Sequence, residues 1–281
     1  IGVVAVFLVT LRWPSSWLLL VPATLPVLDL RPWTGRLYLD EWDLLVLAVL
    51  AALFLRRGLG LVPEASARLL PAGRLWLGAY LVSYVLALLW ALWPPVWPEP
   101  FAFTTLLSNE HGLRLAKGVL SAVLLWPFFH RVTADRMAAV SRFATGMLLG
   151  LLATVTVVLW ERMVFPGLFN LSQNYRVTGM FSDTHTGGAF LEGYLVAAIP
   201  FLAVVLLWRR RWLWGSLAAL LFVLAVYSVG VTFARAGYAG LLVASLVLLL
   251  GLMHSFIQGG GIRWAELVGV LVVAGAGTTL L

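Results

Sequence analysis

The sequence contains no cysteine and few charged residues for its length. Cysteine is absent from all 281 positions, which excludes disulfides, zinc–thiolate sites, iron–sulfur clusters and thiol nucleophiles. Only 11% of the residues are charged, whereas a typical water-soluble domain has roughly 25%. With 62% hydrophobic residues and a mean hydropathy of +0.98, the chain does not have the composition of a water-soluble globule. We therefore expect an integral membrane protein.

Apolar runs fill most of the chain, and short polar or proline- and glycine-rich breaks separate them. A bilayer span needs roughly 20 apolar residues, and continuous apolar runs do not alternate as barrel strands do. We predict an all-α, polytopic membrane protein with about ten transmembrane helices, which form a single domain over residues 1–281. Both chain ends lie inside apolar runs, so we expect a fragment truncated at both ends. The predicted spans are 1–11, 16–30, 42–55, 75–93, 113–130, 143–164, 188–208, 212–231, 238–256 and 264–281.

The chain has a formal net charge of +7, but its basic residues are scattered in ones, twos and threes between apolar runs. This distribution sets membrane topology and does not form a groove for nucleic acid. If the connection 56–74 is cytoplasmic, 12 of the 19 basic residues lie on the cytoplasmic side, in agreement with the positive-inside rule. The segments around 165–187 and 231–237 then face the opposite side. The cytoplasmic set is Arg12, Arg56, Arg57, Arg68, Arg74, Arg131, Arg136, Arg142, Arg209, Arg210, Arg211 and Arg263.

The basic residues on the outer side need another explanation. Arg162 directly follows Glu161, and an ion pair between them is the favoured interpretation. The arginines and acidic residues of segment 29–43 are expected to neutralise one another in a solvated loop. Arg114 and Lys117 lie about one helical turn apart. They either present two cations to an anion at the outer interface or reach toward lipid phosphates.

Two polar segments interrupt the apolar second half of the chain. Residues 175–188 read YRVTGMFSDTHTGG, and residues 232–237 read TFARAG. Charged residues at the ends of membrane helices are costly and are usually functional. Arg176 and Arg235 each lie in a glycine-flanked break. A guanidinium is always charged and binds phosphate bidentately, so the two arginines are candidates to clamp a diphosphate. The alternative is that each pairs with a nearby carboxylate.

Three further ionisable residues accompany these arginines. His185 is the local candidate for a catalytic base, since an unperturbed imidazole has a pKa of about 6.5; the alternative is a neutral, hydrogen-bonded histidine. Asp183 either supports the site or caps the helix that follows it. Glu192 lies inside that helix, and we expect it to orient an outer arginine. The four histidines are dispersed along the chain, and we predict no metal and no cofactor.

At this point the sequence resembles a known family. Arg176, Gly179, Phe181 and Asp183, followed by TFARAG at 232–237, resemble the core of the O-antigen ligase and O-antigen polymerase superfamily. Its members are polytopic glycosyltransferases of the bacterial inner membrane. The resemblance covers about residues 170–250, and the rest of the chain is compatible with it in hydropathy only.

The resemblance implies a reaction at the periplasmic face. A glycan is transferred from an undecaprenyl-diphosphate carrier to a hydroxyl of lipid A core, another glycan or a protein. Arg176 and Arg235 would correspond to the family's donor-binding arginines. Membrane lipids would surround the protein. The family's second motif more often reads Ser-Arg-Gly, whereas Ala234 and Ala236 flank the arginine in this chain. Family ligases also carry a late periplasmic loop with a histidine base, and we expect that loop beyond Leu281.

A membrane transporter is the main alternative. Breaks at Gly187-Gly188 and at Gly237 would then line a substrate path. The sequence shows no convincing internal repeat, and its charged breaks lie at one membrane face instead of the midplane, which favours an interfacial enzyme. The spacing of Gly146 and Gly150 separately predicts close helix packing within the membrane.

Overall fold

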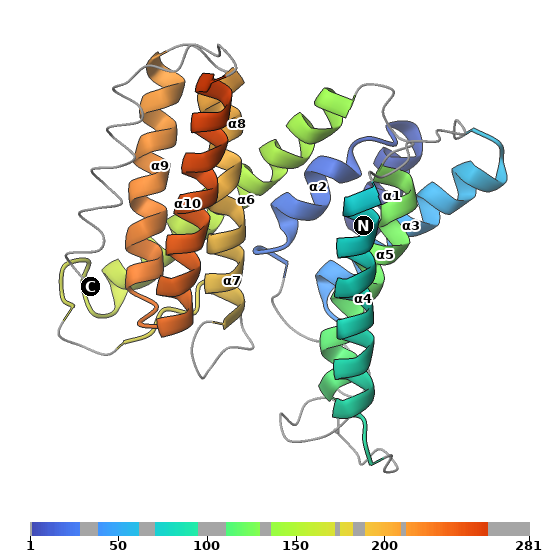
Figure 1. The fold of residues 1–281 in the computed structure, drawn as a ribbon, viewed down its shortest axis with the longest axis horizontal. Helices are drawn as coiled ribbons and strands as arrows, with labels where there is room; N and C mark the ends of the chain where they lie inside the picture. Colours follow the sequence, from blue (N-terminus) through green and yellow to red (C-terminus); the bar gives the residue numbers. More distant parts are fainter. Residues whose placement is uncertain are drawn as a thin grey trace. The chain divides into compact units, whose positions relative to one another are not determined.

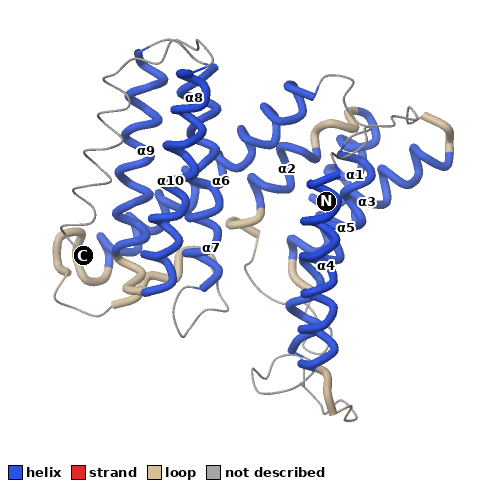
Figure 2. Tube along the Cα trace, in the orientation of Figure 1, coloured by secondary structure: helices blue, strands red, loops and turns tan. Residues whose placement is uncertain are grey.

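A computed structural model gives the fold of the chain. All regular elements in the part that it describes are helices, as Figure 1 and Figure 2 show, which confirms the all-α class. The described residues are 2–28, 39–61, 71–94, 111–129, 136–171, 175–181, 189–208 and 212–257. The helices are α1 (Gly2–Arg12), α2 (Trp17–Thr24), α3 (Glu41–Gly58), α4 (Pro71–Ala91), α5 (His111–Phe129), α6 (Arg136–Val164), α7 (Ala189–Ala198), the 3₁₀ turn η2 (Ile199–Phe201), α8 (Leu202–Trp208), α9 (Trp212–Gly230) and α10 (Arg235–Ile257).

Five helical spans among the described residues are long and apolar enough to cross a membrane. Each coincides with a predicted apolar run, so these five predictions are confirmed by length and composition. One of them combines α7, η2 and α8. The short 3₁₀ turn η2 divides this span because it contains Pro200, whose ring nitrogen cannot donate a helical hydrogen bond. The spans are Arg74–Ala91, Met137–Val164, Phe190–Leu207, Leu213–Gly230 and Arg235–Ser255.

The described helices do not support the prediction of about ten spans. Helices α1 and α2 have 11 and 8 residues, so they rise about 16 Å and about 12 Å, far less than the ~30 Å hydrocarbon layer. Helix α3 has 18 residues, but Glu41, Asp43, Arg56 and Arg57 occupy its two ends. The predicted span 264–281 lies outside the described residues. The apolar runs correctly predicted helices in this part of the chain, but the helices are shorter than the runs suggested or carry charges at their ends.

The helices form two compact units, and each is described here by itself. The first unit contains Ile1–Trp17 and Arg31–Ala139, and the second contains Leu18–Leu30 and Val140–Leu281. In the first unit, α3 packs against α1 and α5, and α4 packs against α5. In the second unit, α10 packs against α7, α8 and α9 (Figure 1). Both segments of the predicted site belong to the second unit.

Many apolar side chains point outward from the helices, as in proteins surrounded by lipid. Helix α4 shows this most clearly, because none of its span Arg74–Ala91 is buried. Trp76 and Trp90 of this helix are 76% and 85% exposed. A helix that is hydrophobic on all sides is stable in a bilayer, where lipid replaces water as the solvent. The composition and the exposed surface together identify a membrane protein.

The core of the second unit lies where α6, α7, α9 and α10 meet. Leu151, Leu195, Phe222 and Leu248 represent these four helices in it, and all are at most 2% exposed. Val177 from the segment after α6 belongs to the same core and is fully buried. The core therefore fixes that segment, which carries one of the predicted site residues.

Close packing at the predicted glycine pair is confirmed. A Cβ atom at Gly146 would lie 2.5 Å from the carbonyl oxygen of Leu19, and one at Gly150 would lie 1.9 Å from the Tyr194 hydroxyl. That hydroxyl is 3.2 Å from the carbonyl oxygens of Pro22 and of Met147. The two glycines therefore let α2 and Tyr194 of α7 approach α6 directly.

Candidate functional site

Segment 175–181 follows α6 and carries Arg176, whose side chain points away from the core. Val177 and Phe181 are buried, whereas Arg176 is exposed. Gly179 has a φ of +62°, which a side chain would strain. A Cβ atom there would also lie 3.3 Å from Leu191. The inward residues anchor the segment, and the guanidinium is left facing outward.

Glu161, near the end of α6, binds this segment through several hydrogen bonds. The Tyr175 hydroxyl donates to Oε1 at 3.0 Å, and the Gly179 amide donates to Oε2 at 2.8 Å. The Thr178 amide lies 3.1 Å from Oε1 and 3.2 Å from Oε2. Glu161 itself is only 6% exposed. Burial, together with the hydrogen bond to Glu161, raises the pKa of the Tyr175 hydroxyl above its ordinary value.

Arg162 has a different set of partners from the one predicted. The structure shows no ion pair with Glu161 among the described residues, since consecutive residues on a helix do not face each other. Arg162 is fully buried, and its Nη2 donates to the carbonyl oxygens of Gly167 and Asn170 at 3.1 and 2.7 Å. A cation at this end of α6 also complements the helix dipole. Arg162 therefore stabilises the turn that leaves α6.

Arg235 is the first residue of α10, and its side chain is exposed. The turn before it contains Phe233 with a φ of +52°. The Thr232 hydroxyl donates to the carbonyl oxygen of Val229 at 2.7 Å, and the Tyr238 hydroxyl donates to that of Gly230 at 3.0 Å. A cation at a helix N-terminus opposes the helix dipole. The position of Arg235 therefore does not serve the stability of α10.

Glu192 of α7 lies near both arginine-bearing segments. It is 7% exposed, and its Oε2 makes no hydrogen bond within the described part of the chain. A Cβ atom at Gly237 would lie 3.1 Å from this oxygen, so the carboxylate rests against the first turn of α10. Gly179, three residues after Arg176, lies against Leu191, the residue before Glu192. The segments that carry Arg176 and Arg235 therefore both contact the N-terminal end of α7 near this carboxylate.

A cavity of about 200 Å³ adjoins this carboxylate. Its walls come from α7 and α10, and glycine is the commonest residue in them. A Cβ atom at Gly240 would lie 3.1 Å from Val196, which shows how closely the two helices approach below the arginines. Apart from Glu192 the lining is apolar. It consists of Glu192, Gly193, Val196, Ala236, Gly237 and Gly240.

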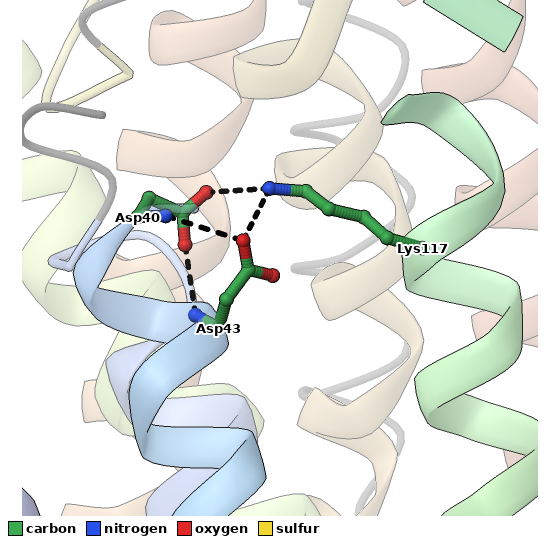
Figure 3. Close-up of polar contacts among 3 residues, drawn as sticks. All are labelled: Asp40, Asp43 and Lys117. Carbon is green, nitrogen blue, oxygen red and sulfur yellow. Dashed lines mark hydrogen bonds and ion pairs between the residues drawn. The ribbon is translucent and has the colours of Figure 1, made fainter. Parts of the chain in front are cut away.

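Lys117 belongs to the first unit, where two carboxylates bind its ammonium group (Figure 3). Nζ lies 3.0 Å from Asp40 Oδ2 and also pairs with Asp43 Oδ2. The same two aspartates cap α3, because each side chain accepts a hydrogen bond from the other residue's backbone amide. From the sequence, these two aspartates were expected to neutralise the arginines of segment 29–43. Lys117 thus has an internal anionic partner in addition to its predicted role toward a donor.

Three predicted site residues are not covered by the structure. Asp183 and His185 lie outside the described residues, and so does the side chain of Arg114. Their roles stay predictions. In the described ranges, no group of three histidine, aspartate or glutamate side chains is arranged to hold a metal ion.

The sequence analysis did not predict that Glu161 binds the segment that carries Arg176. A visible signal was a pair of opposite charges in an otherwise apolar span, just before the polar segment that carries Arg176. The pair was interpreted as an internal salt bridge. In the structure each charge instead binds backbone groups of the following loop.

The chain was also compared with known proteins. No family model, curated protein or solved structure matches it. The resemblance to O-antigen ligases therefore stays a hypothesis. The function has to be argued from the arrangement of Arg176, Glu192 and Arg235 in an all-helical membrane protein.

Proposed function

We propose that this protein transfers a glycan from an undecaprenyl-diphosphate carrier to an acceptor hydroxyl at the periplasmic face of the bacterial inner membrane. The acceptor would be lipid A core, another glycan or a protein. One observation carries the proposal: Arg176 and Arg235 are both exposed, and the separate segments that carry them both contact the N-terminal end of α7 near Glu192. Neither guanidinium makes a hydrogen bond or ion pair within the described residues, so both are available to an anion.

The chemistry of a lipid diphosphate fits two cations at a membrane surface. The acceptor oxygen attacks the anomeric carbon, the bond from that carbon to the diphosphate oxygen breaks, and the lipid diphosphate leaves with the electron pair. Arginines that bind both phosphates stabilise the developing charge. A base must take the acceptor proton, and His185 is the candidate within this chain. This reaction requires no cofactor.

The position of the arginines in the membrane supports a lipid-linked donor. Arg235 begins the apolar span α10, and Arg176 lies in the segment between the apolar spans α6 and α7 to α8, close to the start of α7. A carrier's prenyl chain would stay in the hydrocarbon layer, and its diphosphate would be at the interface where these helix ends lie. We propose in addition that both arginines face the periplasm.

The test measures binding and transfer of an undecaprenyl-diphosphate-linked sugar by the purified protein in lipid nanodiscs. The variants are Arg176→Ala and Arg235→Ala, and Arg142→Ala is the matched control because it removes an exposed arginine near the other end of α6. Loss of a charge-assisted hydrogen bond costs about 1.5–3 kcal/mol. We therefore expect each site variant to bind the donor about ten- to a hundredfold more weakly.

The control variant should bind and transfer as wild type does, and all variants should keep their helical content. Unchanged donor binding in both site variants would refute the arginine clamp. If the donor then moved across the membrane of sealed vesicles without being consumed, the transporter would become the better explanation.

A further inference from the structure

We infer that Glu161 is a positioning residue, whose carboxylate fixes the segment 175–181 and thereby presents Arg176 to the donor diphosphate. The inference rests on the proposed function for the identity of the ligand. The fixing itself rests only on the geometry of α6 and the segment that follows it.

Glu161 binds the segment on both sides of Arg176. Tyr175 comes just before the arginine and donates from its side chain, whereas Thr178 and Gly179 come just after it and donate from the backbone. Both oxygens of the carboxylate are used. Since the residues on each side are tied to one group, the backbone at Arg176 has little freedom to move.

The core holds the same segment from the opposite direction. Val177, next to the arginine, is fully buried. Arg176 beside it is exposed, so these two neighbouring side chains have opposite surroundings. The carboxylate and the core together determine where the guanidinium emerges.

Successive amides beside a left-handed glycine form a concave anion site, known as a nest. Thr178 and Gly179 provide this arrangement, with a φ of +62° at Gly179. In many phosphate-binding loops such a nest holds the phosphate. In this chain both amides already donate to Glu161, so an external phosphate would have to be bound by the Arg176 side chain.

The buried charge of Glu161 is compensated locally. A carboxylate in a membrane helix is costly unless hydrogen bonds satisfy it, and Glu161 accepts from three groups of the segment. Arg162 beside it donates to carbonyl groups of the turn before the segment. The two residues thus bind the two halves of the same loop, with the anion on amides and the cation on carbonyls.

The test uses Glu161→Gln, which keeps the size of the side chain but leaves only one oxygen to accept. The NH2 group that replaces the other oxygen cannot accept, so the side chain can no longer bind Tyr175 and Gly179, on the two sides of Arg176, at once. Hydrogen exchange of the Thr178 and Gly179 amides in the nanodisc-embedded protein should become about tenfold faster or more, since an amide protected by one good acceptor opens more easily without it. Donor affinity should fall about tenfold, as expected when a binding group loses its fixed geometry.

A double-mutant cycle separates positioning from general damage. Donor affinity is measured for wild type, Glu161→Gln, Arg176→Ala and the double variant. If Glu161 acts through Arg176, the glutamine substitution will cause no further loss once the arginine is absent. An equal loss in both backgrounds, or unchanged exchange of the two amides, would overturn the inference.

The same experiment distinguishes this inference from the proposed function. Full donor binding by both Arg176→Ala and Arg235→Ala would refute the arginine clamp of the proposed function, and the exchange rates would still show whether Glu161 holds the segment. Weak binding by Arg176→Ala combined with normal binding by Glu161→Gln would refute only the positioning role. Circular dichroism of each variant verifies that the helices are retained.

Discussion

The buried carboxylates of this chain have different surroundings, and the difference separates structural from functional residues. Glu161 accepts hydrogen bonds at both oxygens, and Asp40 and Asp43 have Lys117 and each other's amides. Glu192 keeps one oxygen without a hydrogen bond in the described part of the chain. An unsatisfied polar atom in a buried position costs about 1–3 kcal/mol. Among these four carboxylates, Glu192 therefore has an oxygen left over that can accept from a further donor group.

At the same scale, Lys117→Ala should destabilise the first unit. The substitution leaves two aspartates close together, both at most 11% exposed in their side chains, without their shared cation. Removing one partner of a mostly buried ion pair strands the other charges, so we expect a loss of about 1–3 kcal/mol. The measurement is the thermal unfolding midpoint of the purified protein in detergent.

Arg57→Ala is the control for this experiment, because it also removes a basic residue but from an exposed position in α3. Its unfolding midpoint should stay close to wild type. A normal midpoint in Lys117→Ala together with weaker donor binding would instead favour the role in donor binding that the sequence suggested for this lysine.

Among the elements, the sequence predicted the long helices of the second unit well. The runs 143–164, 212–231 and 238–256 correspond to α6, α9 and α10, because each is apolar, long and bounded by polar or charged residues. The run 188–208 was predicted as one helix, and a 3₁₀ turn divides it at Pro200. The runs 1–11, 16–30 and 42–55 were predicted as spans, but their helices are too short or too charged at the ends.

Glycine spacing predicted one helix contact, and its strength can be tested. Gly150→Ala places a methyl carbon about 1.9 Å from the Tyr194 hydroxyl oxygen, far closer than two such atoms can approach. The helices must separate or Tyr194 must move and lose its bonds to carbonyl oxygens. Overpacking of this kind costs about 1–3 kcal/mol, and the unfolding midpoint should fall accordingly.

Gly251→Ala is the matched comparison, since no atom lies within 4 Å of a Cβ at that position in α10. Alanine is a better helix former than glycine by about 0.5–1 kcal/mol, so this variant should unfold at the same temperature or slightly higher. If Gly150→Ala were as stable as Gly251→Ala, the close approach of α7 and α2 to α6 would be contradicted.

At the scale of the whole molecule, the sequence located part of the site but not the contacts that build it. Arg176 and Arg235 were singled out because charge is rare in this chain, and the structure brings them to one end of the second unit. The link between them is Glu192, whose contact with Gly237 depends on how α7 crosses α10. That crossing is a tertiary property, and no spacing along the chain encodes it. The hydrogen bonds of Glu161 were missed for the same reason.

The orientation of the molecule in the membrane gives the last prediction, and the absence of cysteine makes it directly testable. A single cysteine introduced at Phe169 or Ile257 would be the only thiol, and both positions are highly exposed, at 93% and 77%. The first follows the C-terminal end of α6, and the second is the last residue of α10. The positive-inside rule places them on opposite sides of the membrane.

Intact spheroplasts treated with a membrane-impermeant maleimide should therefore label Phe169→Cys and leave Ile257→Cys unlabelled until the membrane is broken. The reverse pattern would place Arg176 and Arg235 in the cytoplasm. There they could not meet a carrier whose glycan is already on the periplasmic side, so glycan transfer at that face would be refuted. The arginine clamp would then have to bind a phosphate-bearing ligand of the cytoplasm.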